Sequence, residues 1–180
     1  MKKFPRFILR MFGWRIDERT PEGIKKCVIV VGPHTSNWDF IIGKLAFSAY
    51  GFKTKFLIKK EAFVPVFGFF LKRMGGIPVD RSGKNNLTNT AVRYFNENES
   101  MYLVFTPEGT RSYNPNWKKG FFYIAQKAEV PIVVAYIDYA KKCGGFKEVM
   151  SAQADVDEGI EYIKSLLTEH KGKYPDKGIY

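Results

Sequence analysis

Residues 26–40 read KCVIVVGPHTSNWDF, and the organisation of the chain can be worked out from this stretch. The apolar run Val28–Val31 is typical of a strand buried on both faces, and the turn-forming pair Gly32-Pro33 ends it. His34 therefore lies between a buried strand and a helix predicted at Trp38–Tyr50. Asp39 follows His34 five positions later, in the first turn of that helix.

The pair of His34 and Asp39 has two interpretations, and the pair alone leaves both open. A neutral imidazole can take a proton from a hydroxyl while a carboxylate on its other nitrogen fixes the tautomer. The substrate then supplies the hydroxyl, and no serine or cysteine nucleophile is needed. In the other interpretation, Ser36 and Asp39 form a capping box in which Asp39 reaches back to the amide of Ser36, without any catalytic role.

The length and composition predict a single globular domain with an excess of positive charge. A chain of 180 residues can bury a proper core, and its 45% hydrophobic and 26% charged residues exclude a disordered chain. Lys and Arg number 29 against 18 Asp and Glu, which gives a net charge of +11. This charge favours anionic partners such as nucleic acid, acidic lipid or a phosphorylated substrate.

The cysteines and the second histidine form no metal or redox site by their spacing. Cys27 and Cys143 lie in or beside apolar stretches, which favours buried free thiols in a reducing compartment. His170 lies among charged residues near the end of a predicted helix, and we expect it on the surface. Two distant histidines without a cysteine cluster do not make a zinc site, so we expect no metal.

Strand-like apolar runs alternate with helix-like patterns along the chain. The expected strands are Lys26–Val31, Lys53–Ile58, Ile77–Val79, Tyr102–Phe105 and Pro131–Tyr139. The expected helices are Trp38–Tyr50, Glu61–Met74, Asn86–Asn96, Lys119–Ala128 and Val156–Glu169, the last with Asp155 as its N-cap. This alternation predicts an α/β domain with a central, mostly parallel sheet flanked by helices. Ligands of such sheets bind beyond the carboxyl ends of the strands, where His34 is expected.

Two further polar loops follow predicted strands or helices in the same way. The loop Gly75–Arg81 begins with paired glycines that fit a left-handed helix end, and it finishes with an arginine. A guanidinium after a buried strand usually meets a carboxylate or a phosphate. The loop Thr106–Ser112 is a fixed turn with Glu108 and Arg111 at its tip, although these two could also form a local salt bridge. We expect the three loops to converge on one cleft.

Residues 1–15 form an amphipathic basic segment ahead of the main domain, which we assign to residues 16–180. The cations of this segment interleave with aromatic and aliphatic residues, so it could lie in an anionic membrane interface or dock on the core as an ordinary surface helix. No uncharged stretch reaches the roughly 18 residues that span a bilayer, and no signal-peptide core is present, so we expect no transmembrane span.

Together these loops resemble the motifs of the glycerolipid acyltransferases, the family typified by 1-acylglycerol-3-phosphate acyltransferase. The matching stretches are His34–Asp39 (His, four residues, Asp), Gly76–Arg81 (a Gly-rich short strand and an arginine), Pro107–Ser112 (PEGTRS, unchanged) and Val130–Val133 (the start of a hydrophobic strand with proline). Val134 stands where a second proline is common in the family, so the last match is partial and the role of that proline is in doubt. The resemblance spans about residues 27–138 in the expected order.

The resemblance implies an acyltransferase-like fold and a direct transfer without an acyl-enzyme. An acyl thioester on coenzyme A or acyl carrier protein would meet the hydroxyl of a lysophospholipid such as 1-acylglycerol-3-phosphate. In this chain His34 would act as the general base, and Asp39 would orient it and stabilise the imidazolium. Apart from the thioester as co-substrate, no cofactor is expected.

The resemblance also assigns roles to the other two loops. Arg81 would hold the phosphate of the acceptor, as similar arginines do in the family. The third motif would bind the acceptor or shape the site through Glu108 and Gly109, with Thr110, Arg111 and Ser112 supporting the loop. The implied location is the cytoplasmic face of the inner membrane, as a peripheral or monotopic enzyme on an anionic surface.

Residues 62–71 are apolar and have basic flanks, and three interpretations fit them: an interfacial segment, a wall of an acyl tunnel, or a buried core helix. Two alternatives to the lysophosphatidate reaction also stay open. The acceptor could be another lysolipid, for example an amino-acid lipid. The chain could instead be a basic membrane- or nucleic-acid-binding module without catalysis, although it has neither an RNP-type motif nor a zinc spacing, and we expect no nucleic-acid partner.

Overall fold

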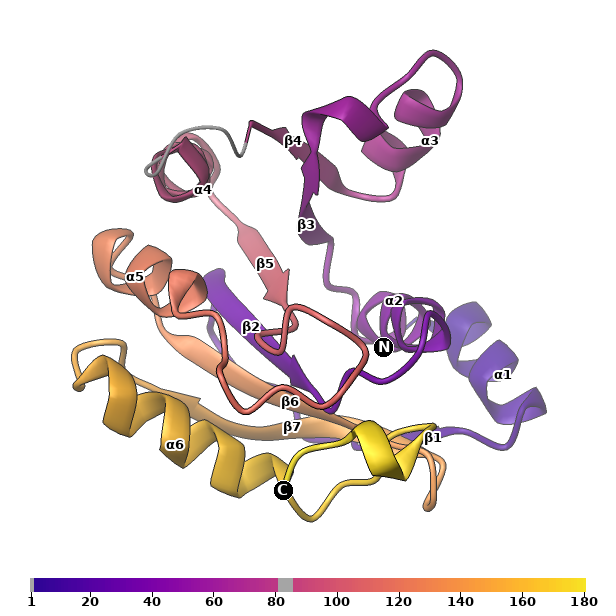
Figure 1. The fold of residues 1–180 in the computed structure, drawn as a ribbon. Coiled ribbons are helices and arrows are strands. Elements are labelled where there is room, and N and C mark those ends of the chain that lie inside the picture. The colour runs from indigo at the N-terminus through magenta and orange to yellow at the C-terminus, as the bar shows by residue number, and fades with distance from the viewer. Residues whose placement is uncertain (1, 81–85) are drawn as a thin grey trace.

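The computed structural model describes residues 2–80 and 86–180, and its centre is a seven-stranded sheet of order β1-β7-β6-β2-β5-β3-β4 (Figure 1). The strands are β1 (Arg15–Ile16), β2 (Lys26–Gly32), β3 (Thr54–Lys59), β4 (Gly76–Val79), β5 (Met101–Phe105), β6 (Ile132–Asp138) and β7 (Cys143–Met150). Neighbouring strands are parallel, except that β6 and β7 are antiparallel. The predicted α/β domain with a mostly parallel central sheet is therefore confirmed.

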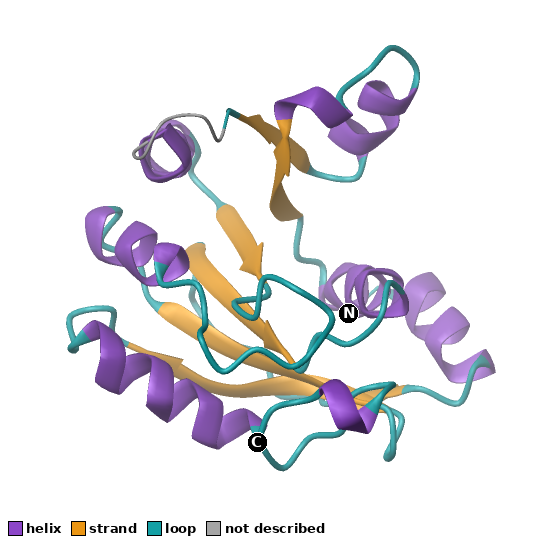
Figure 2. Cartoon of the chain, viewed as in Figure 1, coloured by secondary structure: helices purple, strands orange, loops and turns teal. Residues whose placement is uncertain are grey.

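Helices cover both faces of this sheet (Figure 2). They are α1 (Lys3–Met11), α2 (Trp38–Tyr50), α3 (Phe67–Arg73), α4 (Asn86–Glu97), α5 (Gly120–Lys127) and α6 (Val156–Leu167), with short 3₁₀ turns η1 (Lys60–Ala62) and η2 (Pro175–Lys177). Helices α4, α5 and α6 pack in one core cluster on one face, and α1 and α2 pack on the other.

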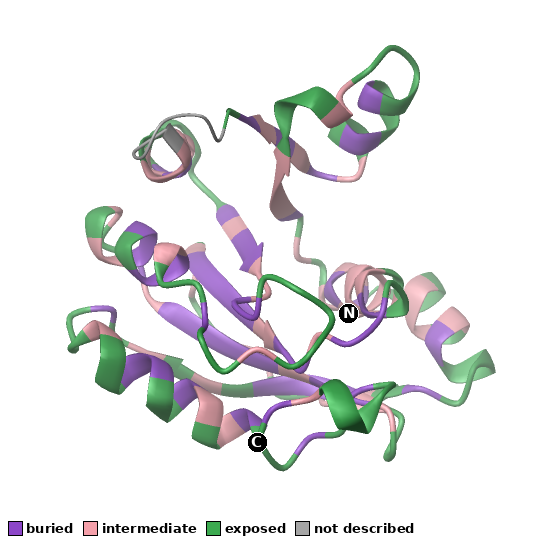
Figure 3. Cartoon of the chain, viewed as in Figure 1, coloured by how far each residue is buried: buried purple, intermediate pink, exposed green. Residues whose placement is uncertain are grey.

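The central strand β2 is buried on both of its faces, as its continuous apolar sequence predicts. Val28 and Val30 belong to the cluster under α4, α5 and α6, whereas Cys27 and Ile29 belong to the cluster under α2. The strands are mostly buried and the helices show buried and exposed bands, which is the pattern of a sheet sandwiched between amphipathic helices (Figure 3). The carboxyl end of this rigid strand carries His34.

The sheet divides next to β5, because β3 changes its pairing partner along its length. Its first residues pair with β5, through Thr54 with Tyr102 and Lys55 with Leu103. From Phe56 onward, β3 pairs with β4 instead. The carboxyl halves of β3 and β5 are therefore not hydrogen-bonded to each other, and a cavity described below lies between them.

Predicted and observed elements agree most closely where the apolar pattern is strong. Helix α2 has the predicted bounds, and β2 extends only one residue further, to Gly32. The N-cap predicted at Asp155 is confirmed, since its Oδ1 accepts from the amides of Asp157 at 2.9 Å and Glu158 at 3.1 Å. Strands β1 and β7 were not predicted: β1 has two residues, and the glycines and charges of β7 hide its alternation.

Helix α3 is shorter than the predicted Glu61–Met74, and the interpretation of this segment as a buried core helix is wrong for most of its side chains. A proline at position 65 disfavours helical backbone before it, and Val66 has a φ of 67°, so the helix begins at Phe67. Gly68 and Leu71 are buried, Gly68 against the backbone of Phe63. The large apolar side chains that remain exposed are Val64, Val66, Phe67, Phe69 and Phe70.

The paired glycines after α3 form the predicted left-handed helix end. Gly75 has a φ of 99°, and its amide donates to the carbonyl oxygen of Lys72 at 3.0 Å. A Cβ atom at Gly75 would lie 2.3 Å from the carbonyl oxygen of Thr54 on β3. Glycine is therefore required here by both the backbone conformation and the close approach of β3.

His170 is buried, which corrects the expectation of a surface position. Its ring stacks on Tyr136 with centroids 4.0 Å apart, and its Nδ1 lies 3.2 Å from Oδ2 of Asp138. The segment after α6 folds back over the carboxyl ends of the strands, and this places His170 in the interior. Burial lowers the pKa of His170, although its hydrogen bond with Asp138 opposes the shift.

Helix α1 is an amphipathic helix that lies on α2 and exposes most of its apolar side chains. Leu9 and the following Trp14 are buried against Ile137 of β6. The exposed apolar residues are Phe4, Phe7, Met11 and Phe12. Within the described parts of the chain, no helix is both long and apolar enough to cross a bilayer.

Candidate active site

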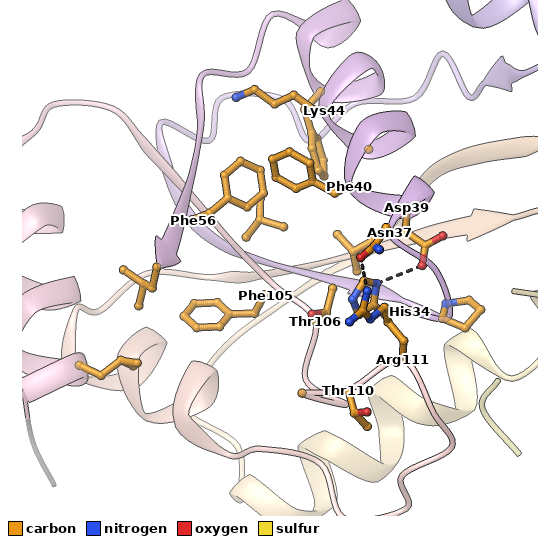
Figure 4. A pocket seen from close by; sticks show the side chains of 18 residues that line it. His34, Asn37, Asp39, Phe40, Lys44, Phe56, Phe105, Thr106, Thr110 and Arg111 are labelled. Atoms are coloured by element: carbon orange, nitrogen blue, oxygen red, sulfur yellow. Dashed lines mark hydrogen bonds and ion pairs between the residues drawn. The ribbon is translucent and has the colours of Figure 1, made fainter. Parts of the chain in front are cut away.

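His34 and Asp39 meet at the carboxyl end of β2, as their spacing predicts. A cis Gly32-Pro33 peptide bond turns the chain out of the strand, and the first turn of α2 carries the carboxylate back toward the imidazole. Nδ1 of His34 lies 3.0 Å from Oδ2 of Asp39 (Figure 4). With Nδ1 facing a carboxylate, Nε2 is the ring nitrogen that can accept a proton from a substrate.

Asp39 also accepts hydrogen bonds from its own loop, so the contact of the capping interpretation and the contact with His34 are both present. Its Oδ2 accepts from the amides of Thr35 at 2.8 Å and Ser36 at 2.9 Å, and its Oδ1 accepts from the hydroxyl of Tyr139 at 2.6 Å. Burial alone would raise the pKa of Asp39, but the hydrogen bonds from His34, Tyr139 and the two amides hold this pKa below its usual range. Asp39 is therefore an ionised carboxylate, and Nδ1 of His34 is the donor in their contact.

Glu108 supports the His34 loop from behind and does not line the cavity. Its Oε1 accepts from the backbone amide of His34 at 2.9 Å, and its side chain is only 6% exposed. No described residue provides a hydrogen bond to its Oε2. Burial raises the pKa of Glu108, and the amide of His34 and other hydrogen bonds oppose the shift only in part. The role in acceptor binding that the resemblance implied for Glu108 stays a prediction.

The third motif reaches the cavity through the residues that follow Glu108. Gly109, Thr110 and Arg111 all line the cavity. Gly109 has a φ of 67°, a left-handed conformation that glycine adopts without strain. The guanidinium of Arg111 donates to Oδ1 of Asn37, so within the described chain Arg111 does not form the local salt bridge with Glu108 that the sequence allowed.

The cavity has a volume of about 620 Å³ and two chemically different ends. Figure 4 shows the polar end around His34, Thr110 and Arg111, and the aromatic end around Phe40 and Phe56. The apolar lining comes from α2, α4, β2, β3 and β5 and consists of Val31, Phe40, Phe47, Phe56, Leu57, Leu87, Val104 and Phe105. Residues 62–71 are not part of this lining, so they do not form its wall.

A lysine lies beside the aromatic end of the cavity. Nζ of Lys44 is 3.4 Å from both the carbonyl oxygen and the hydroxyl of Thr54, and it lies 5.3 Å from the centre of the Phe56 ring. Burial and, to a smaller extent, the neighbouring Lys55 lower the pKa of Lys44. The cavity is therefore apolar along its walls but has a cation at each end, Arg111 and Lys44.

Arg81 lies outside the described residues, so its predicted contact with an acceptor phosphate stays a prediction. The described chain brings together the other predicted site residues, with Glu108 placed behind the loop and not in the cavity. Sequence reasoning missed Tyr139, which contacts Asp39 across 100 positions of sequence, and it missed Asn37. No local pattern around Tyr139 indicated this contact, because it depends on how β6 lies beside β2.

Comparisons with known proteins agree with this geometry. Residues 14–138 match the family model described as Acyltransferase. The chain is 36% identical over 101 residues to 1-acyl-sn-glycerol-3-phosphate acyltransferase epsilon of Mus musculus, covering 53% of this chain and 27% of that protein. It is 32% identical over 118 residues to 1-acyl-sn-glycerol-3-phosphate acyltransferase of Saccharomyces cerevisiae, covering 61% and 38%. The chain thus spans well under half the length of these relatives.

The fold is similar to a solved structure as well. The crystal structure of the 1-acyl-sn-glycerophosphate (LPA) acyltransferase PlsC from Thermotoga maritima superposes with a TM-score of 0.65 at 19% identity. The match covers 91% of this chain and 73% of that one. At this identity the likeness concerns the fold.

Proposed function

This chain belongs to the acyltransferase family, and we propose that it transfers an acyl group from an acyl thioester to the hydroxyl of a lysophospholipid such as 1-acylglycerol-3-phosphate. The donor would be acyl-coenzyme A or acyl-acyl carrier protein. One observation carries the proposal: the 3.0 Å contact between His34 and an ionised Asp39 lies at the polar end of a cavity whose walls beyond it are mostly apolar. The names of the two relatives support this class of acceptor.

His34 is the general base of the proposed reaction. Its Nε2 takes the proton from the acceptor hydroxyl as the oxygen attacks the carbonyl carbon of the thioester. The tetrahedral intermediate then breaks its carbon–sulfur bond, and the imidazolium returns the proton to the departing sulfur. Asp39 stays ionised throughout, fixing the tautomer of His34 and stabilising its cation.

Proton transfer by a placed base contributes about 10²–10⁴-fold to such a rate. The remainder of the acceleration must come from holding the two substrates in line and from donors to the developing oxyanion. The arginines of the second and third motifs supply positive charge for this purpose. We assign the acceptor phosphate to Arg81, and we place Arg111 at the rim where the reacting groups meet.

The acyl chain would lie in the apolar end of the cavity. A volume of about 620 Å³ falls within the range of roughly 300–1,000 Å³ that is usual for small-ligand sites. Side chains of Phe40, Phe56, Leu57 and Phe105 offer it an apolar surface. Burying the chain there would remove its methylene groups from water, at about 0.8 kcal/mol for each group.

Two exposed apolar surfaces support a membrane as the place of the reaction. Helix α1 presents Phe4, Phe7, Met11 and Phe12, and its neighbouring cations include Lys2, Lys3 and Arg10. The segment from Val64 to Phe70 presents five large apolar side chains between Lys59, Lys60, Lys72 and Arg73. Apolar insertion combined with cations at the headgroups suits an anionic membrane surface. We assign the protein to the cytoplasmic face of the inner membrane.

The test is an acyl-transfer assay with the purified protein. Acyl-coenzyme A and acyl-acyl carrier protein would be supplied as donors against several lysolipids, including lysophosphatidic acid and an acylated amino-acid lipid, and the products identified by mass. We expect diacylated phosphatidic acid from the first acceptor and a loss of at least about 10²-fold in H34A.

Two outcomes would contradict parts of the proposal. Undiminished transfer by H34A would remove the role of His34 as the base. Product from the amino-acid lipid alone would keep the reaction class but replace the acceptor.

A further inference from the structure

The hydrogen bonds of Asp39 are divided unequally between its two carboxylate oxygens. Oδ2 accepts from Nδ1 of His34 and from the amides of Thr35 and Ser36. Oδ1 accepts from the hydroxyl of Tyr139 at 2.6 Å. The first three donors belong to one short loop, whereas Tyr139 immediately follows β6 and lies 100 positions further along the chain than Asp39.

From this arrangement we infer that Tyr139 is a positioning residue, which fixes the plane of the Asp39 carboxylate so that Oδ2 is directed at His34. Three donors hold Oδ2 in place, and all three belong to the loop that itself has to be positioned. The donor at the other oxygen comes from outside this loop and gives the carboxylate a second, independent anchor. The catalytic part of this inference rests on the proposed function, in which His34 is the base and Asp39 orients it.

Tyr139 is suited to this role because it remains a donor and is itself held in place. Burial, together with the hydrogen bond to Asp39, raises the pKa of Tyr139, so its hydroxyl keeps its proton. The backbone amide of Tyr139 donates to the carbonyl oxygen of Lys171 at 2.8 Å. Its ring packs edge-on against Trp14, with centroids 4.9 Å apart and the planes at 90°.

Trp14 connects this contact to the N-terminal helix. It is buried, it follows α1, and its amide donates to the carbonyl oxygen of Leu9 at 2.9 Å. Leu9, Trp14 and Ile137 form one apolar cluster against which Tyr139 packs. Helix α1 therefore has two contacts: it exposes Phe4 and other apolar side chains, and through Leu9 and Trp14 it packs against Tyr139.

The substitution Y139F tests the inference, since it keeps the ring against Trp14 and removes only the hydroxyl. Y162F is a matched control: the hydroxyl of Tyr162 also donates to a carboxylate oxygen, Oε2 of Glu148 at 2.7 Å, but on the exposed side of α6. Both variants lose one tyrosine–carboxylate hydrogen bond. Only Y139F removes one from Asp39.

The first measurement needs no turnover and so stands apart from the proposed reaction. The chain has two histidines, and nitrogen-15 NMR of histidine-labelled protein reports which ring nitrogen of each carries the proton. At a pH where the imidazoles are neutral, His34 should hold its proton on Nδ1 in the wild type and in Y162F. In Y139F this tautomer should lose population, with D39N marking the value for complete loss of the carboxylate.

The second measurement is the kinetics of acyl transfer with lysophosphatidic acid as acceptor. A hydrogen bond to a charged group that acts through orientation should affect kcat, so Y139F should lower kcat by about tenfold and leave KM within about twofold. Y162F should match the wild type. If neither the wild type nor any variant shows acyl transfer, the proposed function fails. The tautomer of His34 still tests the positioning role of Tyr139 in that case.

A Tyr139 that serves only packing would give a different result. An unchanged His34 tautomer in folded Y139F would overturn the inference, as would a kcat equal to that of Y162F. Should Y139F not fold, the wild-type protein supplies the answer. The hydroxyl proton of Tyr139 should then be visible and protected from solvent exchange, and a freely exchanging hydroxyl would reject its bond with Asp39.

Discussion

At the residue scale, the site contains two buried carboxylates, and their surroundings shift their pKa values in opposite directions. Asp39 is buried but receives four hydrogen bonds, and its pKa is lowered. Glu108 is buried with a single oxygen engaged, and its pKa is raised. The surroundings of Asp39 therefore favour its charged form beside His34, whereas those of Glu108 disfavour its charged form.

We expect Glu108 to reduce stability as pH rises. Because its pKa is higher in the folded protein than its ordinary value of about 4.3, the free energy of unfolding falls as pH rises from that value toward the folded pKa. E108Q keeps an oxygen that can accept from the amide of His34 and lacks the ionisable group. Urea unfolding should show that the stability of E108Q relative to the wild type increases between about pH 4 and pH 7.

E108A is the matched control for the hydrogen bond. It leaves the amide of His34 without its acceptor, and this should cost about 1–3 kcal/mol. A difference between E108Q and wild type that does not change with pH would show that burial does not penalise the charge of Glu108.

The residue scale is also where the sequence was both most and least informative. His34 and Asp39 could be paired because their spacing joins a strand end to the first turn of a helix. Tyr139 could not be found, since its contact with Asp39 depends on the pairing of β6 with β2. Glu108 was predicted as a site residue, but no pattern in PEGTRS indicated that its side chain turns inward to the His34 amide.

At the element scale, strands buried on both faces were predictable and exposed elements were less so. The continuous apolar run of β2 leaves little choice of structure, and α2 follows it with a clear helical pattern. The apolar segment before β4 has the same composition as a core helix. This segment differs from a core helix because Pro65 and the backbone conformation of Val66 delay the start of the helix to Phe67. The phenylalanines of the helix are then exposed.

We expect the exposed phenylalanines of α3 to bind membranes. Phe69 and Phe70 are 72% and 54% exposed, and full burial of each side chain is worth about 1.5–3 kcal/mol. F69S/F70S should therefore weaken binding to vesicles of phosphatidylglycerol and phosphatidylcholine by at least about tenfold in co-sedimentation. Added salt should weaken the wild type as well, because the flanking cations contribute.

Y123S is the control for this experiment, since Tyr123 is a comparably exposed aromatic residue on α5. It should bind as the wild type does. Equal losses for Y123S and F69S/F70S would indicate a general effect of surface aromatics, and no loss in F69S/F70S would leave α1 as the membrane contact.

At the scale of the whole molecule, the topology brings the chemistry and the apolar cavity together. The order of the strands places β2 between β5 and β6, so that His34, the third motif and Tyr139 come to one edge of the sheet. The alternation of strands and helices predicted that His34 and the third motif would converge, but it did not predict the position of Tyr139. The separation of β3 from β5 was not predictable, because β3 changes its pairing partner from β5 to β4 within a single strand.

The cavity predicts a change in acyl-chain preference in G43L. Gly43 lines the cavity from α2, and a Cβ atom there would meet only a Phe47 carbon at 4.0 Å, so a larger side chain can enter without displacing backbone. Leucine also favours the helix over glycine by somewhat under 1 kcal/mol. In a competition assay with donors of graded length, G43L should prefer shorter chains than the wild type.

G120L provides the comparison, because Gly120 begins α5 with open space around its Cβ position and does not line the cavity. Its chain-length preference should equal that of the wild type. An unchanged preference in G43L would place the acyl chain elsewhere.

The change of partner by β3 has a mechanical consequence for the whole molecule. In the described chain, the strand pairing joins β3 and β4 to the remaining strands only at Thr54 and Lys55, so we expect these two residues to act as a hinge. A small rotation there moves Phe56 and Leu57 relative to β5, while His34 stays on the strand that forms the other side. If an acyl chain binds there as proposed, such a rotation would change the width of its site without moving His34.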